Sequence, residues 1–65
     1  MKSINTSAVK TLRAANIQDF KPGTVLIDSE GYDHVISEKY IDGIWNTRGS
    51  NVVFEIEARF YKIFA

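Results

Sequence analysis

The last quarter of the chain alternates between apolar and polar positions. In residues 51–64, with the sequence NVVFEIEARFYKIF, the even-numbered residues from Val52 to Phe60 are all apolar. The odd-numbered residues between them are mostly charged, beginning with Glu55. A repeat of two residues is typical of a β-strand with one buried face. We therefore predict a long strand over residues 51–64, with a bulge or bend near Phe60, where the alternation stops.

Three shorter segments upstream also have the composition of strands. Residues 24–28, 32–37 and 43–47 are rich in β-branched and aromatic side chains, and turn-forming residues separate them. Gly49 lies in the loop that would join the third of these segments to the last strand. The pattern predicts an antiparallel meander of four strands, or of five if the last run splits. Residues 37–42 have no clear pattern, and we expect a loop or a single helical turn there.

The N-terminal part of the chain has a spacing of apolar residues that indicates a helix. Its apolar and basic side chains fall on opposite faces: Ala8, Val9, Leu12 and Ala15 against Lys10 and Arg13. Residues 5–7 are all good N-cap types, and Asn16 can adopt the left-handed conformation that ends a helix. We predict one short amphipathic helix over residues 6–16, which must pack on the sheet because it is too short to be stable alone.

Together these elements predict a single α+β domain over residues 1–65. Short strands, tight turns and a bent last strand favour an SH3-like small barrel with the helix packed on one side. An open sheet with the helix across one face is the alternative. Because the chain has 65 residues and no cysteine, neither disulfides nor thiolate zinc sites can add stability to so small a fold. The remaining sources of stability are an aromatic and aliphatic core and self-association.

The stretch IDSEGYDHVI, residues 27–36, contains the only histidine of the chain, His34, close to three acidic residues. A calcium loop would need a glycine at its sixth position, whereas Gly31 is fourth when counted from Asp28, and zinc would need more nitrogen or sulfur ligands. Asp33 precedes His34 on the same predicted strand, so the two side chains point to opposite faces and cannot form an oriented acid–base pair. We therefore predict a hairpin turn with Gly31 in the left-handed conformation, and we expect no metal site, no cofactor and no catalytic residue.

Trp45 is a stronger candidate for a functional residue. On the predicted strand 43–47, Ile44 and Trp45 must point to opposite faces, and a small core can bury only one of them well. If Ile44 is in the core, Trp45 is exposed and has the usual properties of a protein-interface anchor. The alternative is that Trp45 is in the core and Ile44 is on the surface. We predict a partner-binding surface of aromatic and acidic residues: Trp45, Tyr32, Tyr40, Asp28, Glu30 and Asp33.

A second class of function is nucleic-acid binding on a small barrel. Single strands bind where basic side chains lie beside aromatic rings on which bases can stack. The residues that would do this here are Arg48, Arg59, Lys62 and Tyr61. The formal net charge of zero and the five acidic residues within positions 28–42 count against this alternative.

The end of the chain, ARFYKIFA, is apolar and would be prone to aggregate as a free sheet edge. We therefore expect a homodimer that forms through the C-terminal strand. We expect no targeting or membrane-spanning segment, because no apolar run of the required length occurs, and the absence of cysteine fits a cytoplasmic location. The sequence thus predicts a non-enzymatic protein-interaction module that regulates or inhibits a larger partner. Its small size is typical of regulators of this kind, including those encoded by phages.

Overall fold

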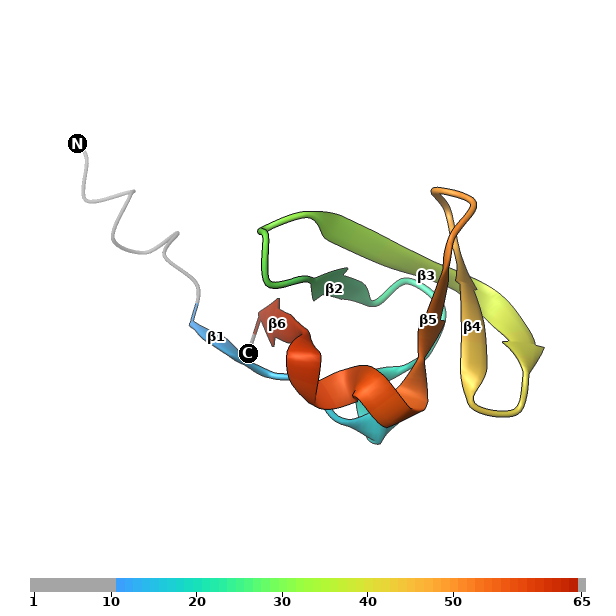
Figure 1. Cartoon of the computed structure of the whole chain (residues 1–65), viewed down its shortest axis with the longest axis horizontal. Helices are drawn as coiled ribbons and strands as arrows, with labels where there is room; N and C mark the ends of the chain where they lie inside the picture. The colour runs from blue at the N-terminus through green and yellow to red at the C-terminus, as the bar shows by residue number, and fades with distance from the viewer. Residues whose placement is uncertain (1–10, 65) are drawn as a thin grey trace.

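The computed structural model describes residues 11–64, which form a six-stranded antiparallel sheet and two short 3-10 helices (Figure 1). The strands follow one another across the sheet in the order β1-β6-β2-β3-β4-β5. Within this part of the chain the elements are β1 (Leu12–Ala14), η1 (Ile17–Asp19), β2 (Val25–Ile27), β3 (Asp33–Ile41), β4 (Ile44–Thr47), β5 (Val52–Phe54), η2 (Glu55–Phe60) and β6 (Lys62–Phe64).

The longest strand, β3, connects the two halves of the sheet. Its first residues pair with β2, with Val35 opposite Val25, and its later residues pair with β4, with Lys39 opposite Trp45. The register between β3 and β4 shifts at two places, and irregularities of this kind bend and twist a sheet. In Figure 1, β2 lies beside the first part of β3, whereas β4 and β5 lie beside its far end. The turns before and after β3 therefore lie at opposite ends of the strand.

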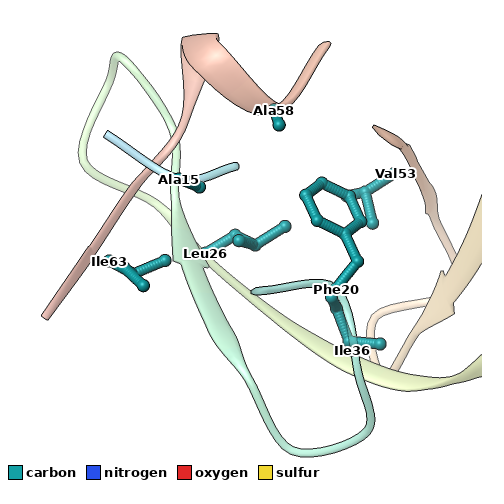
Figure 2. Packing of buried hydrophobic residues seen from close by; sticks show 7 residues of the cluster. All are labelled: Ala15, Phe20, Leu26, Ile36, Val53, Ala58 and Ile63. Carbon is teal, nitrogen blue, oxygen red and sulfur yellow. The ribbon is translucent and has the colours of Figure 1, made fainter. Parts of the chain in front are cut away.

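The core is small and is built from both halves of the sheet. Its buried apolar residues are Ala15, Phe20, Leu26, Ile36, Val53, Ala58 and Ile63 (Figure 2). Leu26 and Ile36, from the neighbouring strands β2 and β3, have no exposed surface. Thr47 is a buried polar residue, and its hydroxyl donates a hydrogen bond to the carbonyl of Asn51 over 3.0 Å. This bond satisfies the hydroxyl and closes the turn between β4 and β5.

The prediction of an N-terminal helix over residues 6–16 is wrong for the part of it that the structure describes. Leu12–Ala14 is strand β1, which pairs with β6 so that Arg13 lies opposite Ile63. The backbone of this segment obtains its hydrogen bonds from a neighbouring strand, and a helix this short would gain little stability of its own. Leu12, which the helix would have buried, is 44% exposed. Residues 6–10 of the predicted helix lie outside the described residues.

The predicted fold class, one helix with four or five strands, is therefore also wrong, both as an SH3-like small barrel and as an open sheet under a helix. The structure is mainly antiparallel sheet, with six strands and only 3-10 turns as helical structure in residues 11–64. The difference has two sources: the segment taken for a helix adds a strand, and the last predicted strand divides. The predicted strands 24–28 and 43–47 correspond to β2 and β4, whereas 32–37 continues to Ile41 and includes most of the segment expected to be a loop.

The last predicted strand, 51–64, is interrupted by η2. Because β5 is at one edge of the sheet and β6 lies between β1 and β2, the chain must cross from the edge to the interior of the sheet, and η2 makes this connection. The alternation was also assigned to the wrong face. Val53 is 1% exposed, whereas Phe54 is 38% and Ile56 is 78% exposed. Within η2 only Ala58 is buried, which shows how little room this turn has against the core.

Candidate functional site

Trp45 lies at the border between the core and the surface. In the register of the sheet it is opposite Val53 of β5 and Lys39 of β3, and it packs against the buried cluster while remaining partly exposed. Its indole Nε1 donates a hydrogen bond to Oε2 of Glu55 over 2.7 Å. The ammonium nitrogen of Lys39 lies 5.6 Å from the centre of the indole ring, within the range of a cation–π interaction.

Neither of the two alternatives for Trp45 and Ile44 describes the structure fully, because both residues are half-buried. Trp45 shares the inner face of the sheet with Val53, which is opposite to it. Ile44 is on the outer face, opposite Phe54 and Ile41. The sheet is thus apolar on both faces at this point, and the outer side chains Phe54 and Ile41 are 38% and 52% exposed.

A shallow groove of about 610 Å³ lies between η1 and η2. It is lined by Ala15, Asn16, Ile17, Gln18, Glu55, Ile56, Ala58 and Arg59. Two of these residues are large and strongly exposed, Ile56 at 78% and Ile17 at 58%. Glu55 belongs both to the lining of this groove and to the hydrogen bond with Trp45, so the indole is connected to the groove through this one side chain.

An ion pair holds η1 in place at the groove. The guanidinium of Arg13 donates two hydrogen bonds to the carboxylate of Asp19, over 2.8 and 3.0 Å. The same carboxylate accepts the backbone N–H of Asn16 over 2.8 Å. The bond from Arg13 is the main cause that lowers the pKa of Asp19, and the bond from Asn16 acts in the same direction. Arg13, placed by the sequence on the polar face of a helix, thus connects β1 to η1.

The turn between β2 and β3 is organised by Asp28. Its Oδ1 accepts the backbone N–H groups of Glu30 and Tyr32 over 2.8 and 2.9 Å, and its Oδ2 lies 2.8 Å from Nε2 of His34. These hydrogen bonds lower the pKa of the Asp28 carboxyl, the one from His34 most of all. The His34 ring in turn meets the edge of Tyr61, with 5.9 Å between the ring centres. Burial raises the pKa of the Tyr61 hydroxyl.

The sequence correctly excluded Asp33 as the partner of His34 but missed Asp28. Because the strands β2 and β3 form a hairpin, Ile27 lies opposite Asp33 and Leu26 lies opposite His34. Asp28, which follows Ile27, therefore comes within reach of the His34 ring across the hairpin. The predicted turn itself is confirmed, since Gly31 has a φ of 90° and donates its N–H to the carbonyl of Asp28. The register of the hairpin was the missing information.

Within positions 11–64, no group of three or more histidine, cysteine, aspartate or glutamate side chains is arranged to hold a metal ion. The part of the chain that the structure describes also contains no helix that is long and apolar enough to cross a membrane.

The predicted aromatic and acidic surface is divided between the two ends of β3. Tyr32 and the acidic turn residues precede this strand, whereas Tyr40 and the Trp45 region are at its other end. Nine residues of strand span up to about 26 Å at a rise of about 3.3 Å per residue. Tyr32 and Tyr40 are 65% and 62% exposed, but the structure does not bring them together.

The basic residues of the nucleic-acid alternative lie around the acidic turn. Arg59 and Lys62 share a hollow of about 390 Å³ with Asp28, and Arg48 shares a different hollow with the same aspartate. The guanidinium of Arg59 lies 4.5 Å from the centre of the exposed Phe60 ring. Tyr61, expected as a stacking platform, is half-buried against the core and His34. The acidic turn thus lies next to the positive charges that a nucleic acid would need.

The groove between η1 and η2 was missed by sequence reasoning. Ile56 was assigned to a buried strand face because it fits the alternation, and Ile17 belongs to no periodic pattern. The only signal for this groove is the slip of the pattern around Phe60, which marks the end of η2. Comparisons of the chain with protein-family models, with curated proteins and with solved structures give no match.

Proposed function

We propose that the chain is a non-enzymatic protein-interaction module that binds a partner protein in the groove between η1 and η2. The observation that supports this most directly is the exposure of Ile56 and Ile17, at 78% and 58%, in one and the same groove. When a partner removes large aliphatic side chains from water, the free energy of the complex falls by about 25 cal/mol per Å² of apolar surface buried. A cluster of such residues is typical of an interaction site.

The groove is supported from both sides, which favours binding. The contacts of Asp19 with Arg13 and Asn16 hold η1, and the bond from Trp45 to Glu55 holds the start of η2. A site whose side chains are ordered before binding loses less conformational entropy when the partner arrives. Trp45, which is connected to the groove through Glu55, is of the residue type that most often dominates the energy of an interface.

The charges of the groove favour a particular kind of partner segment. Glu55 is already engaged by Trp45, whereas Arg59 presents its guanidinium at the surface beside Phe60. The chemistry that fits is an apolar side chain that inserts between Ile17 and Ile56, followed by a carboxylate that pairs with Arg59. By binding a partner protein in this way, the chain would regulate or inhibit that partner in the cytoplasm, as we expect from the sequence.

Site-specific photo-crosslinking in the native host tests the proposal. A photoreactive phenylalanine analogue in place of Ile56 should trap a partner protein, and the variant Arg59→Glu in the same background should reduce the yield. The matched control carries the analogue at Glu30, in the acidic turn. Trapping from position 30 and not from position 56 would contradict the groove and would favour the surface predicted from the sequence.

A further inference from the structure

We infer that the free edge of β5 pairs with the β5 of a second copy of the chain, in a two-fold antiparallel arrangement with Val52 opposite its own symmetry mate. In the described part of the chain β5 pairs only with β4 and is therefore the last strand of the sheet. Charged residues and proline usually protect a sheet edge from pairing, and β5 contains neither. This inference is independent of the groove between η1 and η2.

The hydrogen-bond pattern of β4 and β5 identifies which backbone groups face outward. The N–H of Thr47 bonds to the carbonyl of Asn51, and the N–H of Glu55 bonds to the carbonyl of Gly43. Hydrogen-bonded pairs alternate with non-bonded pairs along an antiparallel ladder. The groups of Val53 therefore face β4, whereas the N–H groups of Val52 and Phe54 and the carbonyl of Val52 face away from it. The carbonyl of Phe54, as the N-cap of η2, is turned toward the first turn of that helix.

The outward-facing N–H and carbonyl groups of β5 can pair with the same groups of a second copy about a two-fold axis. When Val52 lies opposite its symmetry mate, the two residues exchange two N–H to carbonyl hydrogen bonds. The N–H of Phe54 then lies opposite Ser50 of the other copy, an exposed turn residue with a φ of 70°, at the end of this short ladder. A register in which Val52 faced Phe54 instead would leave the N–H of Val52 against a carbonyl that η2 already uses, and a buried unsatisfied donor is unfavourable.

Side chains and charge also fit a second copy of the chain. Val52 and Phe54 are 40% and 38% exposed on the outer face of β5, so the pairing would shield apolar surface of both copies. The formal net charge of the chain is zero, and two identical copies therefore have no net repulsion. The C-terminal strand, expected from the sequence as the dimer interface, is β6 and is paired on one side with β1 and on the other with β2. An edge of three residues corresponds to a small contact and a weak, reversible dimer.

Cysteine crosslinking tests this register, because the chain contains no cysteine of its own. In Val52→Cys the two Cα atoms across the axis would be about 5.5 Å apart, which suits a disulfide. The matched control is Phe54→Cys on the same strand, whose symmetry mate lies four positions out of register, at about 13 Å. We expect a disulfide-linked dimer from the first variant under mild oxidation, and monomer from the second.

The variant Val52→Pro gives an independent test by sedimentation. It removes an N–H that does not bond to β4, so the fold should be retained, while dimerisation should weaken by about 10- to 100-fold. The groove should still bind its partner in this variant, which separates the two proposals. A monomer for the unaltered chain at all concentrations, or equal crosslinking through Phe54→Cys, would overturn the inference.

Discussion

The indole Nε1 of Trp45 and the carboxylate of Glu55 form a hydrogen bond of 2.7 Å that connects β4 to the first residue of η2. The sequence singled out Trp45 as a binding residue and left open whether it belongs to the core. The structure shows a half-buried ring that packs on the core and, through this bond, holds one wall of the groove. The same side chain can therefore contribute both to stability and to the shape of the proposed site.

The variant Glu55→Ala should destabilise the fold and expose the indole. A hydrogen bond to a charged acceptor contributes about 1–2 kcal/mol, and its loss leaves the Trp45 N–H without its partner. Trp45 is the only tryptophan, so a red shift of the fluorescence emission and a lower free energy of unfolding in urea can both be assigned to this site. Glu57→Ala, an exposed acid in the same helix, is the control and should change neither. An unaltered emission spectrum in Glu55→Ala would contradict the role of this bond.

The two faces of β5 can be distinguished by a pair of alanine variants. Val53 is 1% exposed and touches the core, whereas Phe54 is 38% exposed on the outer face. We expect Val53→Ala to reduce the free energy of unfolding by about 2 kcal/mol, because buried methyl groups are lost and a cavity remains. Phe54→Ala should have a clearly smaller effect, although the side chain removed is larger. Equal or reversed effects in urea unfolding would support the buried face that the sequence pattern predicts.

Much of the middle of the fold could be predicted from the sequence, and the physical reason is local. The segments that became β2 and β4 are β-branched or aromatic and are bounded by turn residues, and Gly31 has the left-handed conformation expected for the first hairpin, with a φ of 90°. These features need only the preferences of neighbouring residues. The extension of β3 to Ile41 is different, because Ser37–Tyr40 becomes strand by pairing with β4.

The two ends of the chain could not be predicted, because their conformation depends on distant partners. The spacing of Leu12 and Ala15 fits a helix, but Leu12–Ala14 pairs with β6, some fifty residues later in the chain. Alternation over residues 52–60 fits a strand, but the connection from the sheet edge to β6 requires a tight turn instead. The groove was missed for the same reason, since it exists only where η1 and η2 come together.

The two glycines Gly43 and Gly49 should respond differently to replacement by alanine. A Cβ atom would meet no other atom at either position, so space is not the difference between them. Gly43 has a φ of 84°, which costs an L-residue about 1–2 kcal/mol, whereas Gly49 is outside that region. We expect Gly43→Ala to lower the midpoint of urea unfolding, and Gly49→Ala to leave it unchanged or raise it slightly. A similar decrease in both variants would show that the positive φ of Gly43 does not account for the loss of stability in Gly43→Ala.

The carboxylate of Asp28 should make the stability of the fold depend on pH in the acid range. Its pKa in the folded chain is lowered, first by the hydrogen bond from His34 and then by the N–H groups of Tyr32 and Glu30. A lowered folded pKa means that the stabilisation is complete above the ordinary aspartate pKa of about 3.9, and is lost as the pH falls through the folded value. Asp28→Asn removes the charge, so this variant should be less stable than the unaltered chain near neutral pH. The difference between the two should shrink steadily below about pH 4.

Urea unfolding at a series of pH values from neutral to strongly acid measures this difference. The variant should keep some acid sensitivity, because the pKa of Asp19 is lowered as well and its contacts with Arg13 are intact. Asp33→Asn, which removes the charge of an exposed acid beside the same turn, is the matched control and should not reproduce the loss of stability near neutral pH. A destabilisation by Asp28→Asn that is the same at pH 7 and at pH 2 would mean that the charge of Asp28 is not what organises the turn. The backbone hydrogen bonds to its side chain, which asparagine can still accept, would then be sufficient.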